Sequence, residues 1–404
     1  MKKQKFHTTL HFYLALFLAF SLTLSRVVPL LIALMLLNWI IEGDFKNKFI
    51  ALKNNKFALL FISFYLLHVV GLLYTQNIKS GLFDLEVKLS LLLFPLLYGS
   101  RPLSEGKLNQ VFIAFISGLL LSSVVMLSKA IFLYFTLHEN HFYYEEFAST
   151  GIHLGYMAMY INFGIGGLLL MLLVYKNNRF FIKPVLASCI ILFFLIILIL
   201  LSSKMGLIEL LLQSLGFLIY YICKSKKYLV GVITFLLCAG GLLFVFKYVP
   251  TVSGRFENAI EAVTTKSQDK TKAESTAVRL LIWKAANSII RENILIGTGT
   301  GDAKDCLLAK YEQQGLTGAL AGKLNAHNAY YQVFIALGSI GLITLCIHLF
   351  LPMYFSIKNN NFLYLLFLLI VCFNFLTESM LDAQAGVVFF AFFNSLLCFK
   401  TNTQ

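Results

Sequence analysis

Apolar runs of membrane-spanning length, divided by short charged breaks, follow one another through most of the chain. Hydrophobic residues make up 59% of the 404 residues and charged residues only 13%, so lipid is the solvent for most side chains. Inside a bilayer the backbone must pair its own N–H and C=O groups, which leaves helices as the structure for such runs. The sequence therefore predicts an all-α polytopic membrane protein with about twelve transmembrane helices.

Each predicted span approaches the ~17 to 25 apolar residues that a bilayer requires. The spans are residues 10–24, 27–41, 58–73, 83–98, 111–135, 153–175, 184–201, 205–223, 228–246, 329–355, 362–377 and 383–399. The first run also resembles a secretory signal peptide, but it has no Ala-x-Ala cleavage site and a second run follows at once. We interpret it as a retained helix.

Lysine and arginine residues are distributed very unevenly between the two sides of this topology. With the N terminus inside, seventeen of them fall in cytoplasmic segments, against Arg26, Lys79 and Lys204 in short outer loops. Positive loops stay in the cytoplasm, so both termini are predicted to be cytoplasmic. The net charge of +14 is then a topology signal with some attraction to anionic lipid heads, and it does not indicate nucleic-acid binding.

One long loop on the outer face separates two groups of spans. Residues 1–246 hold about nine spans, residues 247–328 form the loop with short helices, and residues 329–404 hold about three spans. The loop is the extramembrane region large enough to hold chemistry. It carries a lone cysteine, Cys306, and no Cys/His spacing that suggests a metal site.

Within this loop, the stretch "STAVRLLIWKAANSIIREN" predicts a helix over residues 277–292. Its apolar stripe is Val278, Leu281, Ala285 and Ile289. Arg279 falls in the first turn, where a cation opposes the helix dipole. This position hints at an anionic partner, although a solvated surface arginine fits the pattern as well.

A glycine-rich turn follows. Gly297, Gly299 and Gly301 precede a short helix that Asp302 could cap and Gly315 could end. Glycines before a helix can cradle phosphate through backbone N–H groups. The spacing is neither that of a Rossmann motif nor that of a Walker loop, and Asp302 would itself occupy the anion site. We therefore favour a tight turn that positions the loop.

His327 and Asn328 lie where the long loop re-enters the membrane. They head a helix in which Gly338 and Gly341 permit close backbone packing. An imidazole exchanges its proton near neutral pH, as an acid–base catalyst must. A capping or merely interfacial histidine is the alternative, and position alone favours that alternative.

A His-Asn pair, nine residues and then Gly-x-x-Gly resembles the signature of bacterial O-antigen ligases. The wider family includes O-antigen polymerases and some protein O-oligosaccharyltransferases. The preceding "VRLLIWKAANSIIRENILIGTGTG" is similar to that family's Arg-x-x-x-Trp segment and glycine turn. The motifs cover about residues 253–342, and the plan of spans extends the resemblance over the chain. It implies a membrane bundle of the lipid-linked glycosyltransferase type (GT-C-like).

The resemblance also implies arginines that bind the diphosphate of a polyprenyl-linked glycan and a histidine essential for transfer. Arg279 and His327 match those positions. Where the family usually has another arginine, this chain has Lys204 in "LSSKMG", which keeps the charge but loses the two-pronged contact of a guanidinium. Arg255, in "SGRFENAI", is a candidate to supply that planar contact.

A third segment adds candidates for the rim of the cavity. The stretch "GIHLGYMAMY" resembles a family segment on an earlier helix and proposes His153 and Tyr156, together with Asn328. A histidine at the outer end of a span is also common as a plain interfacial residue.

These parts imply inverting transfer of a glycan from undecaprenyl diphosphate to an outer-leaflet acceptor such as lipid A-core. Preorganised cations stabilise the leaving diphosphate, and His327 removes the proton of the acceptor hydroxyl. No Asp-x-Asp pair occurs in the outer loops, so no nucleotide, metal or other cofactor is expected. The expected partners are the lipid-linked donor, a glycolipid or other glycan acceptor, and membrane lipids. The enzyme would sit in a bacterial inner membrane with its active site facing the periplasm.

Two other functions remain open. A polymerase of the same superfamily would use the same donor chemistry with another acceptor. A flippase or transporter would show internal repeats and charged residues at mid-membrane. The sequence shows no convincing repeat, and Lys88 and Lys129 are the clear cations within spans. Glu86 lies on a different helix face from Lys88 and forms no relay with it.

Overall fold

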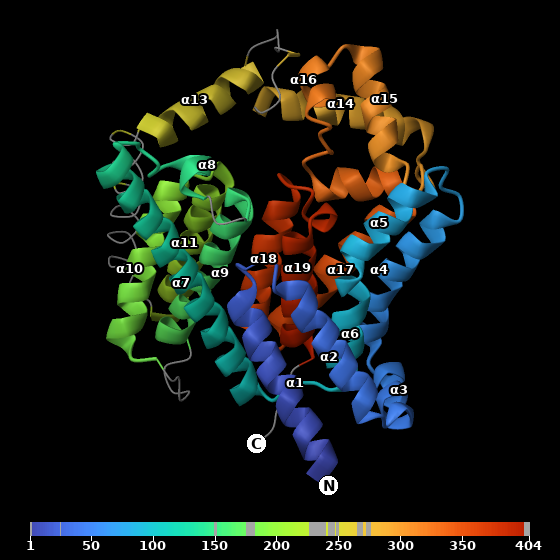
Figure 1. Cartoon of the computed structure of the whole chain (residues 1–404), viewed down its shortest axis with the longest axis vertical. Helices are drawn as coiled ribbons and strands as arrows, with labels where there is room; N and C mark the ends of the chain where they lie inside the picture. Colours follow the sequence, from blue (N-terminus) through green and yellow to red (C-terminus); the bar gives the residue numbers. More distant parts are fainter. Residues whose placement is uncertain are drawn as a thin grey trace. The chain divides into compact units, whose positions relative to one another are not determined.

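The computed structural model describes residues 2–24, 26–148, 152–174, 182–225, 240, 247, 250–264, 270–271 and 276–399. The secondary-structure elements formed by these residues are all helices (Figure 1). The chain forms two compact units, Met1–Gly118 with Thr265–Gln404 and Leu119–Thr264. We call them the first and the second unit.

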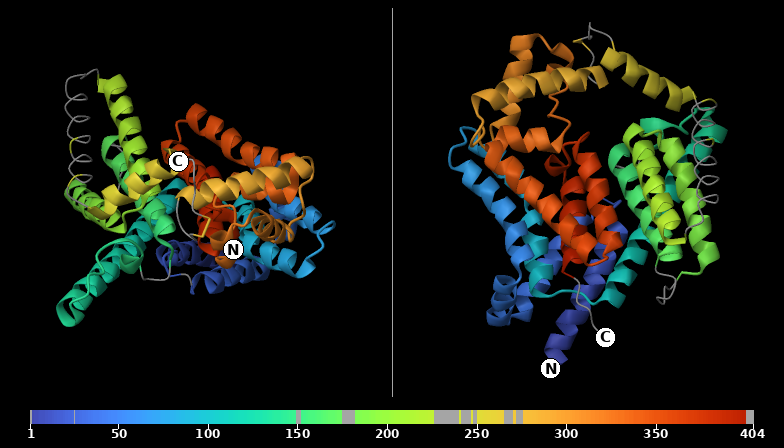
Figure 2. Two further views of the ribbon diagram at one scale, coloured as in Figure 1. Left: turned by 90° about the horizontal axis from the view of Figure 1, so that it is seen from above. Right: turned by 180° about the vertical axis from the view of Figure 1, so that it is seen from behind.

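The first unit contains the chain's N-terminal and C-terminal helices and the helices that precede the His-Asn pair. They are α1 (Lys2–Ser21), α2 (Val28–Glu42), α3 (Phe45–Asn54), α4 (Lys56–Leu72), α5 (Ile78–Lys88), α6 (Ser90–Ser100), α14 (Thr276–Glu292), α15 (Ala303–Gln314), α16 (Thr317–Ala321), α17 (Ala329–Lys358), α18 (Phe362–Phe375), the 3-10 helix η1 (Met380–Asp382) and α19 (Gln384–Cys398). Figure 1 and the right view of Figure 2 place α14–α16 at one end of this unit and α3 at the other.

The second unit contains the middle of the chain. Its helices are α8 (Tyr144–Phe147), α9 (Leu154–Leu173), α10 (Pro184–Leu201), α11 (Lys204–Ser225) and α13 (Pro250–Thr264). The long helix α7 (Glu105–Leu137) begins in the first unit and continues into the second.

Most predicted spans coincide with a helix, and residues 184–201 coincide with α10 residue for residue. The predicted span 83–98 differs, because it divides between α5 and α6 at Leu89. The break directly follows Lys88, whose ammonium lies 3.2 Å from the Asp382 carboxylate of a distant segment. Pro95 also removes a backbone hydrogen bond from α6, because proline has no N–H. The span 228–246 lies outside the described residues except for residue 240.

Among the described residues, five helices are long and apolar enough to cross a membrane, namely α7, α9, α10, α11 and α17. A sixth is added if α2 and α3, which are bent by 114°, form one span. Shorter apolar helices are α4, α18 and α19. The prediction of an all-α chain with several apolar spans is confirmed, whereas the number twelve, the GT-C-like arrangement and the division at residues 246 and 328 stay predictions.

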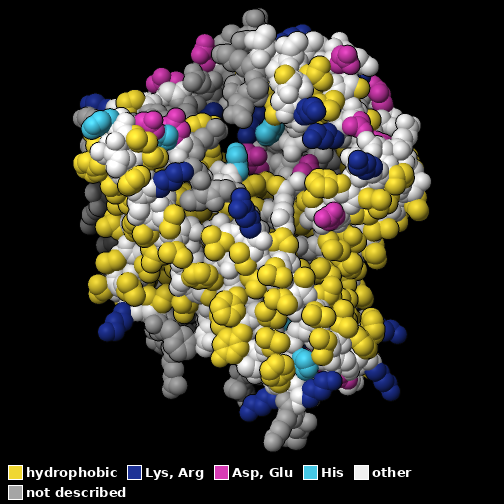
Figure 3. Space-filling view, viewed as in Figure 1, with side chains coloured by type: hydrophobic (Ala, Val, Ile, Leu, Met, Phe, Trp, Pro, Cys, Tyr) yellow, Lys and Arg dark blue, Asp and Glu magenta, His cyan; other side chains and the backbone are white. Residues whose placement is uncertain are grey.

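Large apolar side chains cover much of the surface of these helices. Val185 of α10 is 76% exposed and Phe135 of α7 is 73% exposed, which suits a lipid environment rather than water. In Figure 3 hydrophobic side chains form the middle of the visible face, and Lys and Arg side chains gather at the lower end of the first unit. This is the surface expected of a membrane protein.

Helix α17 and its neighbours form the core of the first unit. Helix α17 packs against α4 and α18, and α19 packs against α6 and α18. Aromatic rings fill the space between α18, α19 and the start of α7: Phe367 lies 5.5 Å from Phe389, and Phe115 lies 5.0 Å from Phe393. These rings are fully or almost fully buried, so the three helices pack closely together here.

A buried polar cluster joins α9 to α11 in the second unit. The Asn162 amide donates to the Gly206 carbonyl at 2.8 Å and to the Glu209 carboxyl at 3.1 Å, and it accepts from Gln213 at 3.3 Å. Gly206 lets the two helices approach, because a Cβ there would lie 2.7 Å from that of Ala158. Close packing around small residues, with polar side chains bonded between helices, is typical of membrane bundles.

The backbone of the long loop bonds directly to the backbone of α17. Gly338 interrupts this helix with φ of +62° and ψ of −159°, and the kink frees backbone groups for pairing. The bonds are Ser339 N–H to the Ile294 carbonyl at 2.7 Å, Thr298 N–H to that of Ile335 at 2.8 Å and Gly299 N–H to that of Ala336 at 2.9 Å. A Cβ on Gly338 would lie 2.3 Å from the Leu295 carbonyl carbon, and one on Gly297 would lie 2.5 Å from that of Ala336. Both glycines are thus required by close approach.

The glycine turn also binds the connection between α4 and α5. The Thr300 hydroxyl donates to the His68 carbonyl at 2.7 Å, and the Asp302 carboxylate accepts from the backbone N–H groups of Gln76 and Asn77, both at 2.7 Å. Asp302 stands at the start of α15 but makes no side-chain cap bond there, so that expectation was wrong. Gly315 ends α15 in the left-handed conformation as expected. The glycines form a tight turn that anchors the loop.

We expect Gly297→Ala to destabilise the protein more than Gly315→Ala. Both glycines have positive φ, but a Cβ at Gly315 meets nothing within 4 Å, so that variant loses only the about 1 to 2 kcal/mol of a left-handed residue. Gly297→Ala also forces backbone apart, and a total loss of about 3 kcal/mol or more is expected. Thermal unfolding of both purified variants in detergent measures this, and equal losses would contradict the backbone junction.

Candidate functional site

Arg279 is presented from the first turn of α14. This helix buries one face against α15 and α17, through Val278, Ile282 and Ala285 among others, as its apolar stripe predicts. The Arg279 side chain remains 32% exposed. Its Nη1 donates to the Thr377 carbonyl at 2.6 Å and its Nη2 donates to Glu378 Oε1 at 2.8 Å. The guanidinium is therefore directed at the segment between α18 and α19.

Trp283, one turn along α14, fixes the approach to the His-Asn pair. Its Nε1 donates to the Ala326 carbonyl at 2.9 Å, and its ring stacks on that of Tyr331 with centroids 5.9 Å apart. Gln332 accepts from the Ala326 N–H at 3.2 Å. Residues on both sides of His327 are thus held by α14 and by the first turn of α17.

Asn328 caps α17 and ties it to the segment after α18. Its Oδ1 accepts from the Tyr331 N–H at 3.0 Å, its Nδ2 donates to the Leu376 carbonyl at 3.0 Å, and its backbone N–H donates to Ser379 Oγ at 3.2 Å. Asn is a preferred N-cap because its short side chain reaches the unpaired N–H groups of the first turn. Asn328, which the sequence proposed for the rim of the cavity, therefore positions the start of α17.

His327 precedes this cap in a left-handed conformation. Its φ is +46°, an uncommon value for a residue with a Cβ, and its N–H donates to Asn325 Oδ1 at 3.1 Å. Its Nδ1 is buried and lies 3.7 Å from Glu378 Oε2. The His327 side chain as a whole is 24% exposed.

Glu378 is the point at which these residues meet. One carboxylate oxygen bonds Arg279 at 2.8 Å and the other faces His327 Nδ1 at 3.7 Å. The carboxylate is 17% exposed, so water screens these interactions only in part. At 3.7 Å the Glu378 carboxylate is close enough to attract the imidazole but lies beyond hydrogen-bond distance of Nδ1.

A second charged cluster holds the other end of this segment. Lys88 donates to Asp84, one turn earlier on α5, and its Nζ lies 3.2 Å from Asp382 of η1. Burial raises the pKa of Asp382 to about 6, while the Lys88 ammonium opposes that shift. Lys88 is thus neutralised locally, by residues other than Glu86, and the segment bearing Glu378 is anchored to α5.

The remaining predicted site residues belong to the second unit. Lys204 is the first residue of α11 and Arg255 lies within α13, which packs against α11. His153 stands at the N-cap of α9, where its Nδ1 accepts from the Gly155 N–H at 3.2 Å and its ring lies 6.0 Å from that of Tyr156. A capping role, which fits the plain interfacial alternative, accounts for His153.

Gly341 differs from Gly338 in its surroundings. A Cβ on Gly341 would meet side chains of its own helix, Leu337 and Val333, whereas Gly338 faces the backbone of the loop. Gly301 packs against the start of α5, since a Cβ there would lie 2.3 Å from the Asn77 carbonyl oxygen. All five motif glycines thus pack against neighbouring protein atoms. Within the described part of the chain, no group of His, Cys, Asp and Glu suits a metal ion.

Sequence reasoning missed Glu378. The residue follows the predicted span 362–377, at the same outer end of the membrane as His327 in the predicted topology. An acidic residue in a short outer loop, at the level of the candidate histidine, is the signal that could have found it. The stacking of Trp283 on Tyr331 was also missed, because it joins segments that only the folded chain brings together.

Comparison with protein families gives an independent result. The O-antigen ligase family model (Wzy_C) matches residues 187–346, a range that includes Lys204, Arg279 and His327 but ends before Glu378. A comparison with curated proteins gives no match. Residues 187–346 are thus similar to the O-antigen ligase family, in agreement with the motifs found in the sequence.

Proposed function

We propose that the protein transfers a glycan from undecaprenyl diphosphate to a hydroxyl of an outer-leaflet acceptor such as lipid A-core. The observation that carries the proposal is that Arg279 and His327, the two residues named from the family motif, share the carboxylate of Glu378. A cation for the leaving group and a base for the acceptor are both needed for this chemistry. The family match supports a ligase or polymerase of this superfamily.

Arg279 is suited to the donor diphosphate. Its two hydrogen bonds to Thr377 and Glu378 use two of the five N–H donors of a guanidinium. The remaining donors, on a side chain that is 32% exposed, are available to phosphate oxygens in the bidentate geometry that arginine favours. Because Glu378 already balances the charge of Arg279, we expect Lys204 and Arg255 to supply further positive charge for the diphosphate.

His327 is suited to the acceptor. In the proposed step Nε2 takes the proton of the acceptor hydroxyl as its oxygen attacks the anomeric carbon of the donor sugar. The bond from that carbon to the diphosphate oxygen breaks, and undecaprenyl diphosphate leaves with the electron pair. Attack from the face opposite to the leaving group inverts the anomeric configuration. Glu378 stabilises the imidazolium that forms, since its carboxylate faces Nδ1.

The site would face the periplasm of a bacterial inner membrane, with both termini in the cytoplasm and about twelve spans in a GT-C-like bundle. The Lys and Arg distribution supports this orientation, because Arg279 and His327 lie in or beside the long loop that it assigns to the outer face. The donor lipid would then reach the site from the outer leaflet.

His327→Ala and Arg279→Ala, each expressed at the normal level, are expected to lower glycan transfer at least about 100-fold, because each removes one side of the proposed chemistry. Arg291→Ala is the matched control, since Arg291 is exposed near the other end of α14, and it should retain transfer.

The measurement is gel analysis of surface glycolipids in a deletion strain that carries each variant. Free lipid-linked polymer together with bare acceptor identifies a lost ligase, whereas acceptor carrying single repeats identifies a lost polymerase. Normal attachment by both alanine variants would remove the catalytic assignment.

Lys204→Arg is expected to retain transfer, whereas Lys204→Ala is expected to lose it, because the proposal needs a positive charge at the start of α11. The same gel reports the result. Equal transfer by the two variants would show that a charge at this position has no part in binding the diphosphate.

A further inference from the structure

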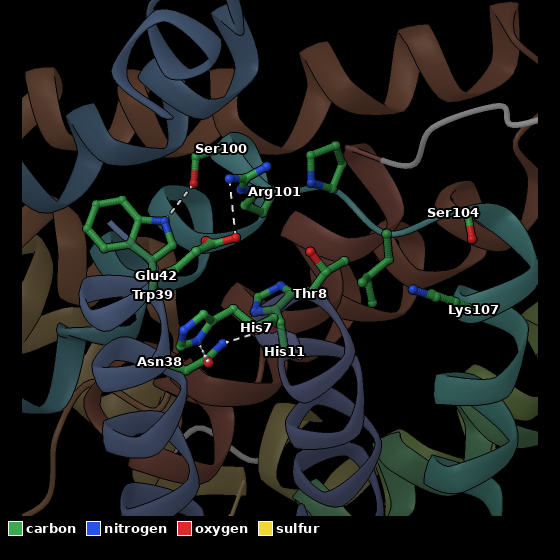
Figure 4. Close-up of a pocket in the computed structure, with 12 residues that line it drawn as sticks. His7, Thr8, His11, Asn38, Trp39, Glu42, Ser100, Arg101, Ser104 and Lys107 are labelled. Carbon is green, nitrogen blue, oxygen red and sulfur yellow. Dashed lines mark hydrogen bonds and ion pairs between the residues drawn. The ribbon is translucent and has the colours of Figure 1, made fainter. Parts of the chain in front are cut away.

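A pocket of about 320 Å³ opens at the end of the first unit opposite to α14 (Figure 4). Helix α1, the end of α2 and the connection from α6 to α7 line it. His11, Glu42, Arg101, Ser104 and Lys107 are among the lining side chains. None of these residues takes part in the candidate site around Glu378, so the pocket needs a separate explanation.

Two buried side-chain nitrogens in this pocket have no hydrogen-bond partner within the described part of the chain. His11 is 6% exposed, and its Nε2 bonds to nothing. The Nε of Arg101 is likewise buried without a partner. Buried polar nitrogens of this kind are costly unless a ligand or solvent satisfies them. The pocket therefore has polar groups available for a bound molecule.

The charges around the pocket do not balance. The Glu42 carboxylate is already shared by Lys48 at 2.7 Å and Arg101 at 3.2 Å, and Asp44 contacts Arg101 at 3.1 Å. Lys107 has no carboxylate within 4.0 Å among the described residues, and its ammonium lies 5.2 Å from the ring centroid of Phe12. The lining side chains thus include two cations, Arg101 and Lys107, and one carboxylate, Glu42, which Arg101 already contacts. An anion would be attracted here.

The position of the pocket indicates which anion. Exposed apolar side chains stand directly beside its lining residues, with Phe6 62% exposed next to His7 and Ile41 52% exposed next to Glu42. Figure 3 shows Lys and Arg side chains gathered at this end of the unit. Basic pockets between membrane helices at this boundary suit phosphate-bearing head groups.

We propose that this pocket binds a phosphate group, with Lys107 and Arg101 as its cationic contacts and His11 Nε2 as a further polar contact. The phosphate belongs either to an anionic lipid, whose acyl chains would cover the exposed apolar side chains of α1 and α2, or to a soluble phosphate compound. The proposal is independent of the transfer reaction, because it concerns the opposite end of the first unit.

The test is the thermal unfolding midpoint of the full chain in detergent, titrated with dioctanoyl phosphatidylglycerol. Lys107→Gln should raise the half-saturating lipid concentration about fivefold, the effect of one cation near a lipid head group. Lys107→Arg should bind as the unchanged protein does. Lys53→Gln is the matched control, because Lys53 is an exposed lysine of α3 that does not line the pocket, and it should leave binding unchanged.

Two further titrations distinguish the sources. Dioctanoylglycerol has the same chains without phosphate and should not stabilise the protein. Saturable stabilisation by inorganic phosphate that Lys107→Gln abolishes would assign the pocket to a soluble phosphate compound. Stabilisation by dioctanoylglycerol as large as that by phosphatidylglycerol, or equal effects of Lys107→Gln and Lys53→Gln, would overturn the proposal.

Discussion

The arrangement of the first unit depends on the kink at Gly338, where the backbone of a membrane helix bonds to the backbone of the loop before it. A continuous helix would offer no free N–H or C=O groups at Gly338. A side chain on Gly338 or Gly297 would keep the backbone of the loop away from the backbone of α17. The junction fixes the end of α14 against α17. Arg279 on α14 and His327 before α17 are therefore held by one rigid connection rather than by a flexible loop.

The charges of the first unit are distributed between two sites at its two ends. Near α14, the Glu378 carboxylate bonds the Arg279 guanidinium and faces the His327 imidazole, and Asp382 anchors the same segment through Lys88. At the other end, Glu42 is bound by Lys48 and Arg101, and Lys107 has no carboxylate within 4.0 Å in the described part of the chain. The first arrangement suits proton transfer beside a bound anion, and the second suits the binding of an anion alone.

Much of this organisation could be predicted from the sequence because it depends on local patterns. The length of apolar runs located α10 and α17, the apolar stripe located α14, and the glycines located a tight turn. The His-Asn pair and the arginine of α14 were identified from their family motif. The features that were missed depend on contacts between distant segments: the division of span 83–98 after Lys88, the binding of Asp302 to the backbone of residues 76 and 77, and the contact of Glu378 with Arg279.

We propose above all that the Glu378 carboxylate positions both Arg279 and His327 for glycan transfer. Its most direct test is the rate of glycan transfer by purified Glu378→Gln, supplied with a polyprenyl-diphosphate-linked glycan and its acceptor. The amide keeps the size of the side chain and one oxygen for Arg279, but it removes the charge that faces His327 Nδ1. We predict a rate at least about 100-fold lower with Glu378→Asp retaining part of the activity. Transfer by Glu378→Gln at the unchanged rate would contradict the account.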